Sequence, residues 1–257
     1  MLIGAQLYNL RNSCKTIEDV KTTLKRVADM GYKSVQLSGV CDYTAEEMIP
    51  MLKENGLVAP LTHFSYDRIV NDTENTIKLH KEIGVKYVGL GSMPGFKKNG
   101  CKKEDIDAFV KAITPAVKKI SDAGLKFMYH NHNMEFVKYG DVTALEYLVE
   151  KFSAEEFGVT LDSYWVVAGG GDTVDWLEKL DGRCNCIHLK DMVYSAEDSA
   201  VRMCPIGSGN INFKKICDYA ISRGTEYAFI EQDYSYDDDP FDCLKSSFDY
   251  LHSLGYC

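Results

Sequence analysis

Four side chains with metal-binding chemistry lie far apart in the sequence, each at or just after a short strand-like run: Glu135, Asp162, His188 and Glu231. Three carboxylates and one imidazole suit a divalent cation such as Mn²⁺, Mg²⁺ or Co²⁺ better than a soft metal. Without a cation, three ionised carboxylates held close together would repel one another and raise one another's pKa values. Each residue alone could equally make an ordinary hydrogen bond at a loop end. Together they predict a site for one divalent metal ion, with Mn²⁺ as the first choice and Mg²⁺, Co²⁺ or Zn²⁺ also compatible.

The segments that must position these residues alternate in character along the chain. Short runs rich in β-branched and aromatic residues predict strands, and the longer amphipathic runs between them predict helices. The expected strands span residues 2–8, 34–37, 57–62, 87–90, 126–131, 157–161, 184–189 and 227–231. The expected helices span residues 17–30, 45–55, 72–83, 103–123, 142–152, 173–180, 213–222 and 243–254. Strands that are each followed by a helix favour a single (β/α)8 TIM barrel of the α/β class, with a doubly wound open sheet as the second choice.

Length and composition agree with one globular domain. The chain has 257 residues, close to the roughly 250 residues of one such barrel. Hydrophobic residues make up 45% of the chain and charged residues 26%, which is a globular composition. No linker or low-complexity segment separates a second domain, so the sequence predicts one TIM-barrel domain over residues 1–257.

The barrel prediction brings polar residues together. Barrel enzymes carry their chemistry at the carboxyl ends of the strands. Four of the six histidines fall at these ends, namely His63, His130, His132 and His188. Because side chains alternate across a strand, His188 shares a face with Lys190, and Glu231 shares a face with Asp233. If these faces point to the barrel axis, their polar groups converge above the core.

The charge balance excludes some partners. Lys and Arg total 29 and Asp and Glu total 38, a net charge of −9, and an acidic surface repels phosphate backbones and anionic membranes. No apolar run approaches the roughly 20 residues that span a bilayer, and the first residues lack the pattern of a signal peptide. The nine cysteines are scattered without a CxxC pair, which is typical of a reducing compartment. The sequence thus predicts a cytoplasmic protein with no nucleic-acid and no membrane partner.

Several segments resemble one known family, in the same order along the chain. Residues 6–11 (QLYNLR) resemble the start of the sugar phosphate isomerase/epimerase family, which belongs to the xylose-isomerase-like TIM barrels. Residues 129–136 (YHNHNMEF), 188–191 (HLKD), 207–211 (GSGNI) and 231–233 (EQD) are similar to further motifs of that family. The resemblance covers essentially the whole chain. It is specific for the superfamily and says little about the substrate.

The resemblance implies a metal-dependent isomerase or epimerase of a sugar or a sugar phosphate. In this interpretation the ion binds the substrate carbonyl and stabilises an enediolate, while Glu135 and Glu231 exchange protons with the substrate carbon. The family's four metal ligands fall on the residues already identified by position. Two positions depart from the family: Trp165 stands where related epimerases carry His, and Gln36 stands where many relatives carry Glu. A Trp can form the floor of a sugar pocket but cannot bind metal, and Gln36 cannot act as a base.

Two further residues are candidates for catalysis. His132 lies three residues before Glu135 and could be a neutral base near pH 7. It could equally be a residue that holds Glu135 or Asp162 in place. Lys190 could stabilise negative charge on a substrate oxygen, or it could form a salt bridge.

Other residues are candidates for contacts with the substrate. Tyr8 and Trp165 could stack on a sugar face, and His63 could line the pocket wall. Arg202 could reach a polar or phosphorylated substrate, although a solvated position is the simpler interpretation. The turn at residues 207–209 (GSG) precedes an expected helix and weakly indicates a phosphate site, since such glycines often mark only a turn.

Three alternative functions stay open at this point. The first is a lyase or dehydratase that acts on a keto sugar, a 3-keto-glycoside or an inositol-like polyol with the same metal. The second is a non-catalytic barrel that binds a sugar or a partner protein. The third is an abasic-site endonuclease, which the net negative charge and Trp165 both argue against. The expected partner is a small carbohydrate, and a homo-oligomer stays open.

Overall fold

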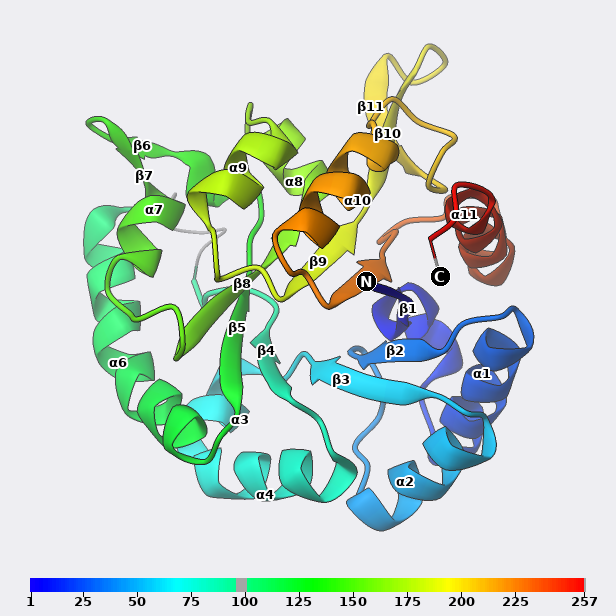
Figure 1. The fold of residues 1–257 in the computed structure, drawn as a ribbon, viewed down its shortest axis with the longest axis horizontal. Helices are drawn as coiled ribbons and strands as arrows, with labels where there is room; N and C mark the ends of the chain where they lie inside the picture. The colour runs from blue at the N-terminus through cyan, green and yellow to red at the C-terminus, as the bar shows by residue number, and fades with distance from the viewer. Residues whose placement is uncertain (96–100, 257) are drawn as a thin grey trace. The chain divides into compact units, whose positions relative to one another are not determined.

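The structure is a computed structural model that describes residues 1–95 and 101–256. Eight parallel strands close into a barrel with helices around it, so the predicted α/β TIM barrel is confirmed. The strands follow the order β1-β12-β9-β8-β5-β4-β3-β2 around the barrel (Figure 1). They are β1 Leu2–Gln6, β2 Ser34–Leu37, β3 Val58–Thr62, β4 Tyr87–Leu90, β5 Lys126–His130, β8 Phe157–Asp162, β9 Cys186–Leu189 and β12 Tyr227–Ile230.

The first strand ends two residues earlier than the sequence predicts. The sequence predicts a strand over residues 2–8, but β1 ends at Gln6 and the chain turns into the 3-10 helix η1, Leu7–Ser13. The Gln6 side chain accepts a hydrogen bond from the Tyr8 backbone N–H, which caps η1. Such local side-chain bonds compete with the bonds of a strand ladder. Tyr8 therefore lies in a helical turn after the strand.

The helices around the barrel are α1 Ile17–Asp29, α2 Ala45–Glu54, α3 Tyr66–Asn71, α4 Thr73–Ile83, α6 Lys103–Asp122, α7 Ala144–Val149, α8 Ser163–Ala168, α9 Thr173–Lys179, α10 Phe213–Ser222 and α11 Pro240–Ser253. All eight predicted helices are present. The sequence did not predict α3 and α8, because six residues are too few to show a helical period. Helix α7 ends three residues earlier than predicted and begins two residues later, because Val142 and Thr143 instead form β7, which pairs with β6 (Lys138–Tyr139).

Local sequence explains where the helices begin and end. Thr16 begins α1 in a capping box with Asp19, and Thr44 begins α2 in the same way with Glu47. Gly84 ends α4 in the left-handed conformation, with φ of 84°, which a residue with a side chain rarely adopts. These stops fix where each following strand starts.

The chain divides into two compact units, Met1–Pro60 with Cys186–Cys257, and Leu61–Asn185. The prediction of one domain over residues 1–257 stays a prediction. We call the two units the terminal unit and the central unit.

In the terminal unit, β2, β1, β12 and β9 are neighbours in register. Gln6 pairs with Gln36, and Phe229 pairs with His188. After β9 the chain forms a hairpin that the sequence did not predict, with β10 (Asp191–Ser195) antiparallel to β11 (Ala200–Cys204) (Figure 1). Its strands follow β9 so closely in the sequence that the apolar pattern alone does not separate them.

In the central unit, β4, β5 and β8 are neighbours in register, and α6 packs against β5. Tyr129 pairs with Val159, and His130 with Thr160. Gly89 in β4 permits a close approach, because a Cβ there would lie 2.1 Å from the backbone oxygen of Thr62 in β3. Because β5 and β8 are parallel and paired in register, their carboxyl ends lie at the same edge.

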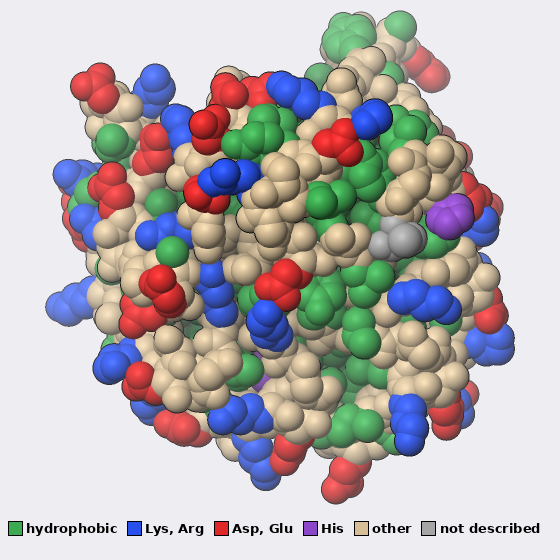
Figure 2. Space-filling view, viewed as in Figure 1, with side chains coloured by type: hydrophobic (Ala, Val, Ile, Leu, Met, Phe, Trp, Pro, Cys, Tyr) green, Lys and Arg blue, Asp and Glu red, His purple; other side chains and the backbone are tan. Residues whose placement is uncertain are grey.

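Surface and membrane features are consistent with the composition. On the face shown in Figure 2, acidic and basic side chains are interspersed and do not gather by sign. Within the described residues, no helix combines the length and the apolar character that crossing a bilayer requires. Within the described part of the chain, none of the eight cysteines forms a disulfide.

Candidate functional site

In the terminal unit, His188 and Glu231 are brought into contact. His188 is fully buried in β9, and Glu231 follows β12 directly and is 5% exposed. Nδ1 of His188 lies 2.7 Å from Oε2 of Glu231. The other ring nitrogen, Nε2, lies 2.6 Å from Oε1 of Gln36 in β2. We call these residues, together with Lys190 and Asp233, the His188 cluster.

Lys190 supplies the positive charge of the His188 cluster. Its side chain is 1% exposed, and its Nζ lies 3.2 Å from Oε2 of Glu231 and 2.9 Å from Oδ2 of Asp233. A buried ammonium group is costly unless acids compensate it, and here two acids do so. The salt bridge that the sequence offered as the alternative role of Lys190 is present, with Glu231 and Asp233 as the partners. The predicted catalytic role of Lys190 stays a prediction.

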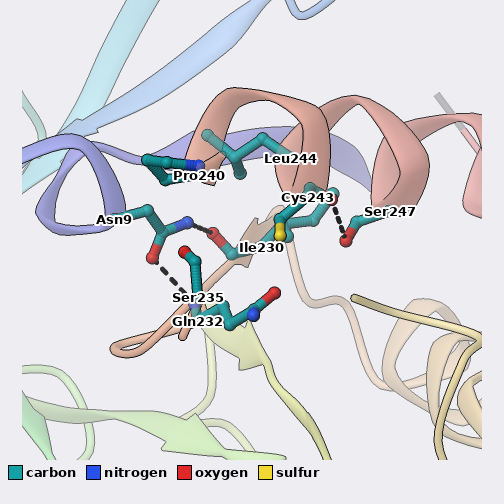
Figure 3. A pocket seen from close by; sticks show the side chains of 8 residues that line it. All are labelled: Asn9, Ile230, Gln232, Ser235, Pro240, Cys243, Leu244 and Ser247. Atoms are coloured by element: carbon teal, nitrogen blue, oxygen red, sulfur yellow. Dashed lines mark hydrogen bonds between the residues drawn. The ribbon is translucent and has the colours of Figure 1, made fainter. Parts of the chain in front are cut away.

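Helix η1 holds the backbone on both sides of Glu231. The Asn9 side chain donates to the backbone oxygen of Ile230 at 3.0 Å and accepts from the backbone N–H of Gln232 at 2.8 Å (Figure 3). Asn9 is buried, and it lines a small pocket together with residues of α11 such as Cys243 and Leu244. The two bonds fix the direction in which Glu231 leaves β12.

The terminal unit also contains the predicted substrate contacts Tyr8 and Arg202. Tyr8 is 38% exposed, and the guanidinium of Arg11 lies 4.5 Å from its ring centroid. Arg202 lies in β11, where its guanidinium binds Asp198 and lies 4.6 Å from the ring centroid of Tyr236. The guanidinium of Arg202 therefore already has an acidic partner within the hairpin. Contact of either residue with a substrate stays a prediction.

The glycine turn after β11 does not offer a phosphate site. Backbone N–H groups of Gly207, Gly209 and Ile211 donate to the carboxylate of Asp191 at 3.0 to 3.2 Å. Burial raises the pKa of Asp191, and these bonds lower it in part. The backbone N–H groups of this turn are thus already occupied by the carboxylate of Asp191, which lies 16 residues before Gly207.

In the central unit, Glu135 is fully buried among neutral donors. It lies in the 3-10 helix η2 (Met134–Phe136), where it accepts from the Tyr129 hydroxyl at 2.7 Å and from the His132 backbone N–H at 2.8 Å. Burial raises the pKa of Glu135 to about 7, and both hydrogen bonds lower it only in part. A carboxyl with this pKa can both give and take a proton at neutral pH.

Asp162 ends β8 and begins α8. Its carboxylate accepts from the Trp165 backbone N–H at 3.0 Å, and its own backbone N–H donates to the Asn131 side chain at 2.9 Å. Nε2 of His130 lies 3.3 Å from Oδ2 of Asp162, and Nδ1 of His130 lies 3.0 Å from the backbone oxygen of Gly91. Both side chains are buried.

The central unit also places four predicted strand-end rings in a row. The ring centroids of His63 and His130 are 5.5 Å apart, those of His130 and His132 are 4.9 Å apart, and those of His132 and Trp165 are 5.3 Å apart. His63, His132 and Trp165 are half-buried. The rings therefore form one partly accessible surface. Their predicted roles, a base for His132 and substrate contacts for His63 and Trp165, stay predictions.

The described residues include a group of four buried side chains of metal-binding type, with His130 and Asp162 in the central unit and His188 and Glu231 in the terminal unit. Three of these are predicted ligands. The fourth predicted ligand, Glu135, is not in the group, and its role as a ligand stays a prediction. The sequence did not single out His130 as a ligand, although its place at the end of β5 was a usable signal.

The comparisons with known proteins agree with this fold. Among solved structures, the chain is 22% identical to a sugar phosphate isomerase/epimerase from Parabacteroides distasonis ATCC 8503, with a TM-score of 0.78 over 98% of this chain and 93% of that one. It is 15% identical to an L-ribulose 3-epimerase, with a TM-score of 0.77 over 99% and 94% of the two chains. It is 14% identical to AsbF from Bacillus anthracis, described as a probable 3-DHS dehydratase, with a TM-score of 0.75 over 98% and 99% of the two chains.

At these identities the structural likeness speaks for the fold alone. A search of curated proteins found no match. The family model described as xylose isomerase-like TIM barrel matches residues 24–254. Because that match covers most of the sequence, the chain belongs to the xylose isomerase-like TIM barrel family.

Proposed function

We propose that this chain is a divalent-metal-dependent isomerase or epimerase of a sugar or a sugar phosphate. The reaction would proceed by proton transfer next to a carbonyl group. The observation that carries the proposal is the way two buried imidazoles, His188 and His130, are held.

Each of these imidazoles has one nitrogen at a carbonyl oxygen and the other at a carboxylate. In His188, Nε2 faces the Gln36 amide oxygen and Nδ1 faces Glu231. In His130, Nδ1 faces the Gly91 backbone oxygen and Nε2 faces Asp162. A carbonyl oxygen only accepts hydrogen bonds, so the nitrogen beside it carries the ring hydrogen. The opposite nitrogen then presents its lone pair toward a carboxylate, an arrangement that a shared cation satisfies.

This arrangement matches the usual surroundings of metal-binding histidines. Such histidines almost always donate their outer N–H to a carbonyl or a carboxylate, which fixes the tautomer. Imidazole nitrogens and carboxylate oxygens together suit Mn²⁺, Mg²⁺, Co²⁺ or Zn²⁺, and a cation also offsets the cost of burying the acids. We propose Mn²⁺, held by Asp162, His188 and Glu231, with Glu135 as the fourth ligand. His130 competes for the fourth place.

The proposed chemistry divides among the chain's own residues. A bound divalent ion would polarise the substrate carbonyl and stabilise the negative charge that develops on its oxygen. Glu135 would take and return the proton, and Glu231 would serve the opposite face of the substrate. The Lys190 ammonium would donate to a substrate oxygen. Trp165, His63 and Tyr8 would provide ring surfaces for a small carbohydrate.

A second candidate is elimination of water from a keto sugar. Two observations favour it: the fold likeness to a probable 3-DHS dehydratase, and a half-buried His132 ring that packs on Trp165. In that case His132 would be the base. Isomerases and epimerases leave solvent hydrogen on the carbon next to the carbonyl, whereas elimination creates a carbon–carbon double bond.

The test combines metal binding with product analysis. Protein stripped with a chelator and reloaded with Mn²⁺ is incubated with ketoses, ketose phosphates and 3-keto-glycosides in deuterated water. We expect deuterium in an isomerised or epimerised sugar with the wild type, and none with Glu231→Gln. The exposed Glu178→Gln serves as the matched control and should behave as the wild type. An unsaturated ketone as the product would favour the dehydratase. No turnover of any sugar despite bound Mn²⁺ would contradict both functions.

A further inference from the structure

We propose that Gln36 is a positioning residue that fixes the ring hydrogen of His188 on Nε2, so that Nδ1 is the atom that binds the metal ion. The part of this inference that concerns the ion rests on the proposed function. The part that concerns the ring hydrogen is a property of the chain itself, and it can be measured without metal.

The position of Gln36 is set by the barrel. It is fully buried in β2 and pairs in register with Gln6 of β1. Its Oε1 lies 2.6 Å from Nε2 of His188, although the two residues are 152 positions apart in the sequence. Because an amide oxygen accepts and does not donate, this contact requires the hydrogen to be on Nε2.

The hydrogen bonds of Gln36 indicate that its role is the contact with His188 and not packing in the core. Its Nε2 has no hydrogen-bond partner among the described residues, so the side chain is buried while only half satisfied. Burying an unsatisfied amide group costs stability. Its neighbours in β2, Val35 and Leu37, are buried apolar residues that carry no such cost. An apolar residue at position 36 would serve the core better, so the bond to His188 is the gain that offsets the loss.

Gln36 has a matched control in the adjacent strand. Gln6 is equally buried, and its Nε2 also lacks a partner among the described residues. Its oxygen accepts from the Tyr8 backbone N–H and not from His188. A change at Gln6 therefore disturbs the same region of the core while leaving the imidazole in place.

The first experiment measures Mn²⁺ affinity by titrating metal-free protein. Gln36→Met keeps the size of the side chain and removes the acceptor, and we expect it to weaken binding about tenfold to a hundredfold. Gln36→Glu replaces the amide oxygen with a charged acceptor that pulls the N–H more strongly, and we expect affinity at least equal to that of the wild type. Gln6→Met removes the bond that begins η1 but leaves the acceptor at Nε2 of His188, so it should weaken binding clearly less than Gln36→Met does. Equal affinity of Gln36→Met and the wild type would overturn the proposal.

The second experiment reads the ring hydrogen directly. In metal-free protein with ¹⁵N-labelled histidine, the imidazole signals of His188 are assigned by comparison with His188→Gln. We expect a hydrogen on Nε2 in the wild type, and loss of that preference in Gln36→Met. A His188 ring with its only hydrogen on Nδ1 would overturn the proposal. This readout also separates the positioning role of Gln36 from the proposed function. A wild type that binds no Mn²⁺ contradicts the proposed function, but the position of the ring hydrogen still tests the role of Gln36.

Discussion

Glu135 in the central unit and Glu231 in the terminal unit are proposed for the same task, but they have opposite surroundings. Glu135 is fully buried, its partners are a hydroxyl and a backbone N–H, and burial raises its pKa to about 7. Glu231 lies beside the Lys190 ammonium and the His188 ring. The charge of Glu231 is thus offset by a cation in direct contact, whereas burial is the largest influence on the pKa of Glu135. The two carboxylates proposed for proton transfer therefore differ in their electrostatic surroundings.

Burial in the central unit also shifts the pKa of a second group, His80. His80 in α4 is 1% exposed, and its ring bonds to the Thr62 hydroxyl and the Thr76 backbone oxygen. Burial lowers its pKa to about 4. Burial therefore favours the neutral form of both groups, since it raises the pKa of an acid and lowers that of a base.

Replacing Glu135 with Gln tests the proposed role of the neutral surroundings, and we expect the largest effect here. The amide keeps the shape but cannot transfer a proton, so kcat should fall by about 10²–10⁴-fold. The free energy of unfolding should not fall, because no buried acid has to be compensated. Steady-state kinetics and urea unfolding check both expectations. A kcat within tenfold of the wild type would remove Glu135 from the mechanism.

Replacing Lys190 with Met tests the cationic surroundings of Glu231. The change leaves Glu231 and Asp233 without their buried cation, and breaking a buried ion pair in this way costs about 3–5 kcal/mol. Lys214→Met is the matched control, because Lys214 forms an exposed pair with Asp218, and such pairs contribute about 0–1 kcal/mol. Urea unfolding measures both. Similar small losses in the two variants would show that Lys190 does not stabilise the acids.

His80 gives a pH test of the central unit. The His80 pKa is about 4 in the folded chain against 6.5 as a reference, so between these pH values the unfolded chain binds more protons. The free energy of unfolding should therefore fall as the pH drops from 6.5 to 4, by roughly 3 kcal/mol from this residue. A His80→Gln variant should lack this part of the decrease. Urea midpoints at several pH values check it, and parallel curves for the two proteins would contradict a buried neutral His80.

Removing the Tyr129 hydroxyl should have the smallest effect. In Tyr129→Phe, Glu135 loses a hydrogen bond that lowers its pKa. The lost hydrogen bond destabilises ionised Glu135 by about 1.5–3 kcal/mol. The acidic limb of the pH profile of kcat/KM should therefore move to higher pH. The rate at high pH should recover toward that of the wild type. A shift to lower pH would mean that another group controls this limb.

The sequence predicted the barrel well, because strands and helices are encoded by local periodicity. All eight strands agree with the structure to within two residues at each end. Tyr8 was assigned to a strand because the apolar pattern continues past Gln6, and only the bond from Tyr8 N–H to the Gln6 side chain shows the turn. The short helix α8 was missed for lack of length.

The site was only partly predictable, because its remaining features depend on contacts between distant segments. Asp162, His188 and Glu231 could be found from their positions at strand ends. Two contacts show this. The bond between Gln36 and His188 joins β2 to β9, and the Asp191 carboxylate binds the backbone of the glycine turn. Local sequence patterns predict neither contact. For His130 the sequence indicated only a position at a strand end. The structure shows a hydrogen bond between its ring and Gly91, and it also shows the opposite nitrogen at Asp162.

The most direct test of the proposed metal site is the metal content of the wild type beside Glu231→Gln. Both proteins are treated with a chelator, reloaded with Mn²⁺, freed of excess ion and measured by elemental analysis. We predict about one ion per wild-type chain, the number that one shared set of ligands would hold, and clearly less in Glu231→Gln. Wild-type protein without metal after reloading would contradict a metal-dependent isomerase or epimerase and leave a barrel that binds a sugar or a partner protein.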